Sequence, residues 1–180
     1  PALVGRLHAA QAPVGQRGLT LATTAGRVQG LVNEGVHAFR GIPYGAPPTG
    51  PKRFMPPTPP RPWTGVRDAI ALGLRAPQPP RAMIPEIGDA LTGSGPMGED
   101  CLCLNVWTTG PTPAGKPVIV WFHGGAYRSG SANSIFYEGS ALAARHNVVV
   151  VTVNHRLNVL GFLDLSGFGD SKYAQSGNVG

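Results

Sequence analysis

The stretch Val118–Ser131, VIVWFHGGAYRSGS, joins an apolar run to a loop that begins His123-Gly124-Gly125-Ala126. Residues without bulky side chains let the backbone approach a ligand closely. They can also turn several N–H groups toward one point, as an oxyanion hole requires. Such fixed donors stabilise the negative charge of the tetrahedral intermediate in acyl transfer. The alternative interpretation of the same residues is a plain tight turn.

The elements around this loop are predicted from their apolar patterns. We expect strands at 101–108, 116–123 and 148–154, and a short helix within 134–146. Nearly all-apolar runs are typical of strands buried on both faces of a parallel sheet, so we expect this of Lys116–His123. The order strand, helix, strand implies a βαβ crossover. In such sheets ligands bind beyond the carboxyl ends of the strands, where the Gly-Gly loop would lie.

The N-terminal part of the chain has a different pattern. Short strands at 19–24, 27–33 and 36–39 are separated by Gly26 and Gly35, which indicates two tight hairpins. The predicted fold class is therefore α/β, with antiparallel hairpin strands leading into a mostly parallel central sheet.

A proline-rich segment, Gly41–Gly65, follows the hairpins. Proline removes a backbone donor, so regular helix and central strand are excluded here. We interpret the segment as an extended surface loop pinned by Phe54 and Trp63. Its sequence PPTPPRP, Pro56–Pro62, leaves a second interpretation open, a ligand for an SH3-type domain.

Composition excludes several functions. The net charge is +6, yet the 15 basic residues are scattered, whereas a nucleic-acid site needs a clustered basic face. No run approaches the roughly 18 apolar residues of a membrane helix. Gly93–Gly98 matches G-x-G-x-x-G but leads into a strand pattern instead of a helix, so it is not a dinucleotide fingerprint. The histidines lack metal-binding spacing. We therefore expect no cofactor, no metal, no nucleic acid and no membrane partner.

Four longer motifs resemble one family. GEDCLCLNVWTTG, FRGIPYGAPPTGPKRFMPP, WFHGGAYRSGSA and VVTVNHRLNVLGFL are similar, in family order, to segments of type-B carboxylesterases, which are cholinesterase-like α/β-hydrolases. The details resemble bacterial esterases of the para-nitrobenzyl-esterase kind. The resemblance implies an α/β-hydrolase fold and a serine ester hydrolase with a small-molecule ester substrate and no cofactor.

The resemblance also implies roles for single residues. The oxyanion N–H groups are assigned to Gly125 and Ala126, while Gly124 allows the turn and His123 helps to hold the loop.

Two further roles implied by the resemblance are structural. An ion pair between Arg53 and Glu99 would tie the proline-rich loop to the segment before the strand at 101–108. Arg156 would pair with an acidic residue shortly after Gly180.

The nucleophile is missing from these residues. None of the serines lies in G-x-S-x-G, and the nearest match, around Ser171, lacks the second glycine. In α/β-hydrolases the triad follows the order serine, acid, histidine, so all five histidines come too early. We interpret residues 1–180 as the N-terminal portion of one carboxylesterase domain, ending before the nucleophile elbow.

On this interpretation the parent protein is an esterase, the isolated fragment is inactive, and the rest of its own chain is needed for a complete fold. The alternative is an esterase-like binding or adhesion protein that has lost its triad.

The two cysteines, Cys101 and Cys103, are predicted to be free thiols. In family members the first cysteine of E-D-C-L pairs with an earlier cysteine, which corresponds here to Ala76. Cys101 therefore lacks that partner, and Cys103 is too close along a strand to replace it. Free thiols favour a reducing compartment such as the bacterial cytoplasm. No apolar segment precedes the peptidase-like Ala10–Ala12, and a secreted or periplasmic location stays open.

Overall fold

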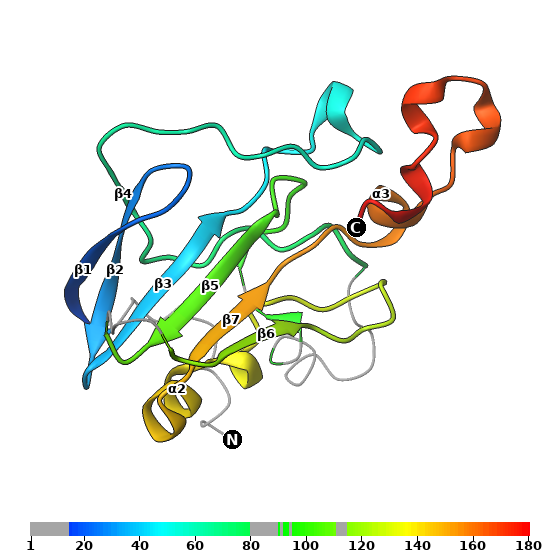
Figure 1. The fold of residues 1–180 in the computed structure, drawn as a ribbon. Coiled ribbons are helices and arrows are strands. Elements are labelled where there is room, and N and C mark those ends of the chain that lie inside the picture. Colours follow the sequence, from blue (N-terminus) through cyan, green and yellow to red (C-terminus); the bar gives the residue numbers. More distant parts are fainter. Residues whose placement is uncertain (1–14, 80–89, 91, 94, 111–114) are drawn as a thin grey trace, which may run out of the picture.

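The strands form one mixed sheet, in the order β1-β2-β3-β5-β7-β6, with β4 paired to β2 outside this path (Figure 1). This computed structural model describes residues 15–79, 90, 92–93, 95–110 and 115–180, and the Ala10–Ala12 stretch lies outside them. The strands are β1 Gln16–Ala22, β2 Arg27–Asn33, β3 Val36–Pro43, β4 Val66–Asp68, β5 Cys103–Thr108, β6 Val118–Phe122 and β7 Val149–Val153.

Two short α-helices and several single turns of 3₁₀-helix lie among the described residues. The helices are α2 Ser140–His146 and α3 Asn158–Phe162. The 3₁₀ turns are η1 Gly50–Lys52, η2 Ile135–Tyr137, η3 Ser166–Phe168, η4 Ser171–Tyr173 and η5 Ser176–Asn178. None of the helices in the described part of the chain is long and apolar enough to cross a membrane.

The predicted hairpins are confirmed. β1 pairs antiparallel with β2, and β2 with β3. Asn33 pairs with Val36 across a two-residue turn in which Glu34 and Gly35 both have positive φ, 48° and 78°. A two-residue turn of this kind matches the right-handed twist of paired strands, and Gly35 adopts it without steric cost.

The proline-rich segment returns to the hairpins and is anchored there. The backbone N–H of Trp63 donates to the carbonyl of Ala25, and its indole Nε1 donates to the carbonyl of Arg27, both at 2.9 Å. Directly afterwards β4 pairs in parallel with β2. These contacts favour the pinned surface loop over a free SH3-type ligand.

The predicted strand–helix–strand unit is also present. β6 and β7 pair in parallel, β5 pairs antiparallel with β7, and α2 connects β6 to β7. Helix α2 packs on the sheet through Ala143, in a core cluster that includes Trp107 and Val150. Figure 1 shows α2 below the sheet, close to the starts of β6 and β7.

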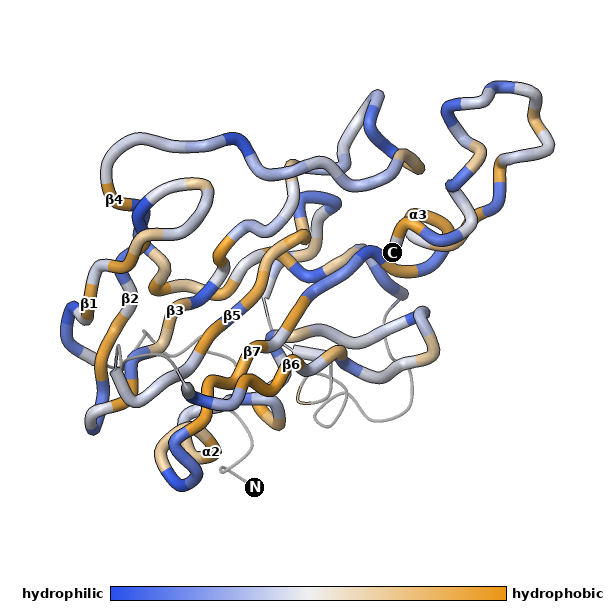
Figure 2. Tube along the Cα trace, viewed as in Figure 1, coloured by the Kyte–Doolittle hydropathy of each residue, from blue (hydrophilic) through white to orange (hydrophobic). Residues whose placement is uncertain are grey.

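The expectation that Lys116–His123 is buried on both faces was wrong for Val118–Phe122 in residues 1–180, whereas His123 is buried. Every residue of β6 is exposed, between 39% and 66% for the five side chains. Within the described residues β6 is bonded only to β7, so one edge and much of both faces lack a neighbour. Figure 2 shows this hydrophobic run at the margin of the fold. An apolar sequence indicates that a strand can be buried, but the strand is buried only where other segments of the protein cover its side chains.

Candidate active site

The loop after β6 and the loop after β7 lie at the same end of the sheet. This follows from the parallel pairing, in which Phe122 is opposite Val153. The first loop is His123–Gly130, and the second runs from Asn154 to the start of α3. Their aromatic rings meet, because His123 stacks on His155 with 4.5 Å between ring centroids and 10° between planes.

The backbone of the Gly-Gly loop has an unusual conformation. Three consecutive residues have positive φ, namely Gly125 at 130°, Ala126 at 54° and Tyr127 at 57°. A Cβ atom on Gly125 would lie 1.8 Å from the carbonyl oxygen of Ser129, so only glycine fits there. Residues other than glycine are uncommon in the left-handed region, and strained backbone gathers at functional sites.

The hydrogen bonds of this loop leave its first amides unused. The carbonyl of Gly125 accepts from the N–H groups of Arg128 and Ser129, at 3.0 and 3.2 Å. Among the hydrogen bonds of the described residues, none is donated by the N–H of Gly125 or Ala126. Two neighbouring donors are therefore available at the carboxyl end of a strand, which is the chemical requirement of an oxyanion hole.

His123 is buried and holds the start of the loop. Its Nδ1 lies 3.0 Å from the carbonyl oxygen of Gly124. A carbonyl can only accept, so Nδ1 must carry the proton in this contact. Burial lowers the pKa of His123, because it disfavours the charged ring; the Gly124 hydrogen bond opposes this shift, and the nearby His155 reinforces it. The neutral ring is therefore favoured.

A buried polar layer lies behind the two loops. The Asn154 side chain accepts from the N–H of Ala132 at 2.8 Å and donates to Oδ1 of Asn133 at 3.2 Å. The backbone carbonyl of Asn154 accepts from the hydroxyl of Tyr44 at 2.7 Å. Sequence reasoning missed this network. The available signal was Asn154 itself, a polar residue that directly follows an apolar strand.

Arg53 and Glu99 form the ion pair that the resemblance implied. Nε and Nη2 of Arg53 donate to the two carboxylate oxygens at 2.7 and 2.5 Å. This hydrogen-bonded pairing lowers the pKa of Glu99 and raises the pKa of Arg53. The pair ties the residues after η1 to the segment that leads into β5.

Arg156 lies in the interior with unused donors. It is 3% exposed, and Nη1 donates to the carbonyl of Met55 at 2.9 Å. Neither Nε nor Nη2 has a hydrogen-bond partner within the described residues. Burial lowers the pKa of Arg156 by disfavouring its charge. A buried cation with two unused donors is costly unless an anion compensates it.

Both cysteines are free thiols, as the sequence predicted, and both are buried. Cys101 packs in a core cluster with Ala76, Leu102 and Leu157. Ala76, the position that the resemblance implied for a partner cysteine, therefore lies beside Cys101. Burial raises the pKa of the Cys101 thiol to about 12, with Cys103 contributing in the same direction. A thiol in this state is a poor nucleophile.

The nearest approach to a nucleophile motif does not form a nucleophile elbow. Ser171 begins the 3₁₀ turn η4, where Asp170 caps the turn by accepting from the N–H of Lys172. An elbow serine instead lies on a sharp turn between a strand and a helix. Ser171 is exposed, and its surroundings offer a turn cap, not an activated hydroxyl.

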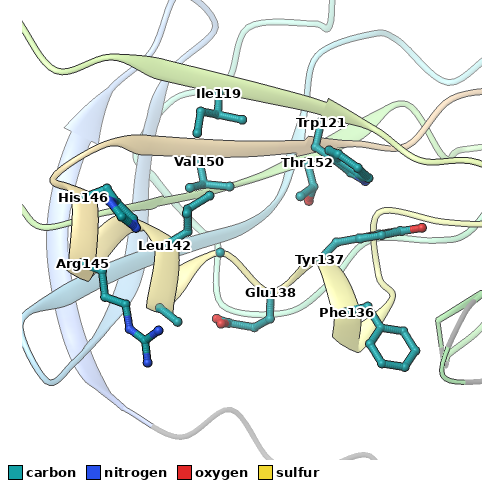
Figure 3. Close-up of a pocket in the computed structure, with 12 residues that line it drawn as sticks. Ile119, Trp121, Phe136, Tyr137, Glu138, Leu142, Arg145, His146, Val150 and Thr152 are labelled. Atoms are coloured by element: carbon teal, nitrogen blue, oxygen red, sulfur yellow. The ribbon is translucent and has the colours of Figure 1, made fainter.

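A separate groove of about 470 Å³ lies between β6, β7 and the segment from η2 to α2. Figure 3 shows its largest side chains, with Trp121 tilted against Tyr137, whose ring centroids lie 5.3 Å apart. None of its lining residues belongs to His123–Gly130. The groove is therefore an uncovered part of the sheet face and not a part of the loop site.

The comparison with known proteins agrees with this geometry. The model of the carboxylesterase family matches residues 17–180. The chain belongs to the carboxylesterase family. The chain is 42% identical to para-nitrobenzyl esterase of Bacillus subtilis (strain 168) over 158 residues, which cover 88% of this chain and 31% of that protein. It is 42% identical to acetylcholinesterase of Gallus gallus over 167 residues, covering 88% of this chain and 21% of that protein.

Solved carboxylesterase structures show the same fold. A carboxylesterase of Geobacillus stearothermophilus superposes with a TM-score of 0.78 at 42% identity, covering 89% of this chain and 31% of that one. An esterase from Clostridium hathewayi gives a TM-score of 0.80 at 39% identity, covering 93% and 34%. This member of the family therefore has the α/β-hydrolase fold, and it spans between 21% and 34% of the length of the four proteins named here.

Proposed function

We propose that the full-length protein is a serine carboxylic-ester hydrolase in which this chain supplies the oxyanion hole. The observation that carries the proposal is the loop after β6, with two adjacent N–H donors that bond to nothing in the described residues. The Bacillus subtilis relative, named para-nitrobenzyl esterase, supports the same class of reaction.

In the proposed mechanism a serine side chain attacks the substrate, and backbone N–H groups of this chain stabilise the intermediate. A serine outside residues 1–180 attacks the ester carbonyl and forms a tetrahedral intermediate. The N–H groups of Gly125 and Ala126 donate to its oxyanion, Gly124 allows the turn, and neutral His123 fixes the Gly124 carbonyl. Collapse expels the alcohol and leaves an acyl-enzyme, which water then hydrolyses.

We further propose that residues 1–180 are the N-terminal portion of one domain and that the rest of the chain completes it. Three features support this: the exposed apolar strand β6, the groove beside it and the buried Arg156 with two unused donors. An acidic side chain from the remainder would compensate Arg156. The serine, acid and histidine of the triad would come from the same part, so the isolated fragment is inactive.

The test is hydrolysis of short-chain p-nitrophenyl esters by the full-length protein. Gly125→Ala would bring a methyl group against the Ser129 carbonyl and displace the donors. Loss of one oxyanion donor lowers kcat by roughly 100- to 1000-fold, and we expect a loss in that range. Gly167→Ala is the matched control, because its added Cβ meets no atom within 4 Å.

The control variant and the wild type should release p-nitrophenol at equal rates. Circular dichroism must show that Gly125→Ala is folded. A wild type without esterase activity would overturn the proposal and favour the non-catalytic binding or adhesion protein. Full activity in a folded Gly125→Ala variant would remove this loop from the mechanism.

A further inference from the structure

Asn158 occupies an unusual place beside the Gly-Gly loop. It is the first residue of α3 and has a φ of 55°. Asparagine tolerates this left-handed conformation better than most residues. The conformation is maintained by three hydrogen bonds, none of which belongs to the helix that Asn158 begins.

All three bonds are donated to carbonyl groups of other segments. The backbone N–H of Asn158 donates to the carbonyl of Tyr127 at 2.9 Å. Its side-chain Nδ2 donates to the carbonyl of Arg128 at 3.0 Å and to the carbonyl of Pro77 at 3.3 Å. One residue therefore binds two consecutive carbonyls of the loop and links them to the segment that contains Pro77.

The neighbour of Pro77 holds the other end of the same loop. The side-chain amide of Gln78 accepts from the N–H of Gly130 at 2.8 Å and donates to the carbonyl of Gly130 at 2.9 Å. The loop is thus fixed at Tyr127 and Arg128 by Asn158 and at Gly130 by Gln78. The Nδ2 contact of Asn158 with Pro77 connects the two anchor points.

We infer that Asn158 is a positioning residue for the oxyanion loop. It donates to the carbonyl groups of Tyr127 and Arg128, downstream of Ala126, and so fixes their peptide planes. The Gly125 and Ala126 N–H groups, in contrast, donate no hydrogen bond within the described residues. The inference rests on the proposed function, and Asn158 itself does not contact the reacting atoms. A small displacement of these donors weakens transition-state binding more than substrate binding, so kcat falls while KM changes little.

The test uses Asn158→Gly in the full-length protein. Glycine keeps the left-handed backbone and the N–H that binds the Tyr127 carbonyl, so only the two side-chain bonds are lost. Asn147→Gly is a matched control, because Asn147 has a φ of 51° at the exposed end of α2 and its side chain bonds, among the residues that the structure describes, only to Thr109. With a p-nitrophenyl ester, we expect kcat of Asn158→Gly to fall about 10-fold with KM within about 2-fold.

Hydrogen–deuterium exchange of the peptide that covers 124–130 gives a readout independent of activity. We expect faster exchange in Asn158→Gly and unchanged exchange in Asn147→Gly. Unchanged exchange in Asn158→Gly would overturn the inference, and so would faster exchange with an unchanged kcat. If the wild type is inactive on esters, the proposed function fails, while the exchange measurement still decides whether Asn158 orders the loop.

Discussion

β6 and β7 are adjacent parallel strands of similar sequence, VIVWF and VVVTV, yet their surroundings are opposite. β7 lies between β5 and β6, and Val150, Thr152 and Val153 are buried. β6 lies at the end of the described sheet, and all of its side chains are exposed. The less apolar strand is thus the more buried one, and within the described residues it is β7 that has a partner on both edges. The apolar run in β6 indicates a place for a neighbour that the described residues do not supply.

The loops that follow these two strands differ in a related way. The loop after β6 offers backbone donors, while the segment after β7 carries buried or half-buried polar side chains, among them Asn154 and Asn158. Side chains that follow the interior strand have neighbouring segments on both sides and can form hydrogen bonds with each of them. They can therefore also bind the loop that follows β6. On the function proposed above, the loop after the edge strand would supply the oxyanion donors, and the segment after the interior strand would hold that loop in place.

The largest expected change in the free energy of unfolding is at Asn154, the residue that directly follows β7. Asn154→Leu removes the acceptor of the Ala132 N–H and the donor to Asn133, and it puts an apolar side chain into a polar site. A buried polar group left without a partner costs about 1–3 kcal/mol. We expect the free energy of unfolding of the full-length protein to fall by about 3 kcal/mol in urea titration.

Asn33→Leu is the matched control, because Asn33 ends β2 and is exposed. We expect it to change the free energy of unfolding by less than about 0.5 kcal/mol. If Asn154→Leu also lowers the free energy of unfolding by less than about 0.5 kcal/mol, the buried polar layer does not contribute to stability.

A pair of valine substitutions with smaller expected losses of stability compares β7 with β6 directly. Val150→Ala in β7 removes two buried methyl groups from the cluster with Trp107 and should cost about 2 kcal/mol. Val120→Ala in β6 is the matched change at a side chain that is 49% exposed in residues 1–180. If the rest of the full-length chain covers β6, both substitutions lower the free energy of unfolding by similar amounts. A Val120→Ala effect under about 0.5 kcal/mol would show that β6 stays uncovered.

The smallest expected effect concerns His123, the residue that directly follows β6. The pKa of His123 is lowered from its ordinary 6.5 by burial, so the unfolded chain binds a proton more readily than the folded chain. The stability associated with neutral His123 is therefore fully present above about pH 6.5, and it is lost as the pH falls below that value. We expect the wild type to lose more stability between pH 8 and pH 5.5 than His123→Asn, as measured by urea unfolding. Parallel pH profiles of the two proteins would contradict a buried, neutral His123.

Several elements were predictable because their signals are local. The turn at Glu34–Gly35 follows from a glycine between two apolar runs, and the strand–helix–strand order follows from periodicity within 116–154. Strand ends were misplaced by up to four residues and β4 was not predicted, since both depend on hydrogen bonds to neighbouring strands. Neither the role of Gln78 nor that of Asn158 was predictable, because each binds a segment that lies 30 or more residues away in the sequence.

The sequence by itself determined the N-terminal hairpin strands, the strand–helix–strand unit, the glycine-rich loop and, through motif resemblance, the pairing of Arg53 with Glu99. These depend on backbone propensities, apolar periodicity and residue identity at fixed spacing. Only the tertiary structure decided that β6 is exposed while Val150, Thr152 and Val153 of β7 are buried, and that His123 stacks on His155. It also decided that the Gly125 and Ala126 amides donate no hydrogen bond within the described part of the chain. Burial and hydrogen-bond partnership are properties of segments brought together in space, and a one-dimensional pattern does not contain them.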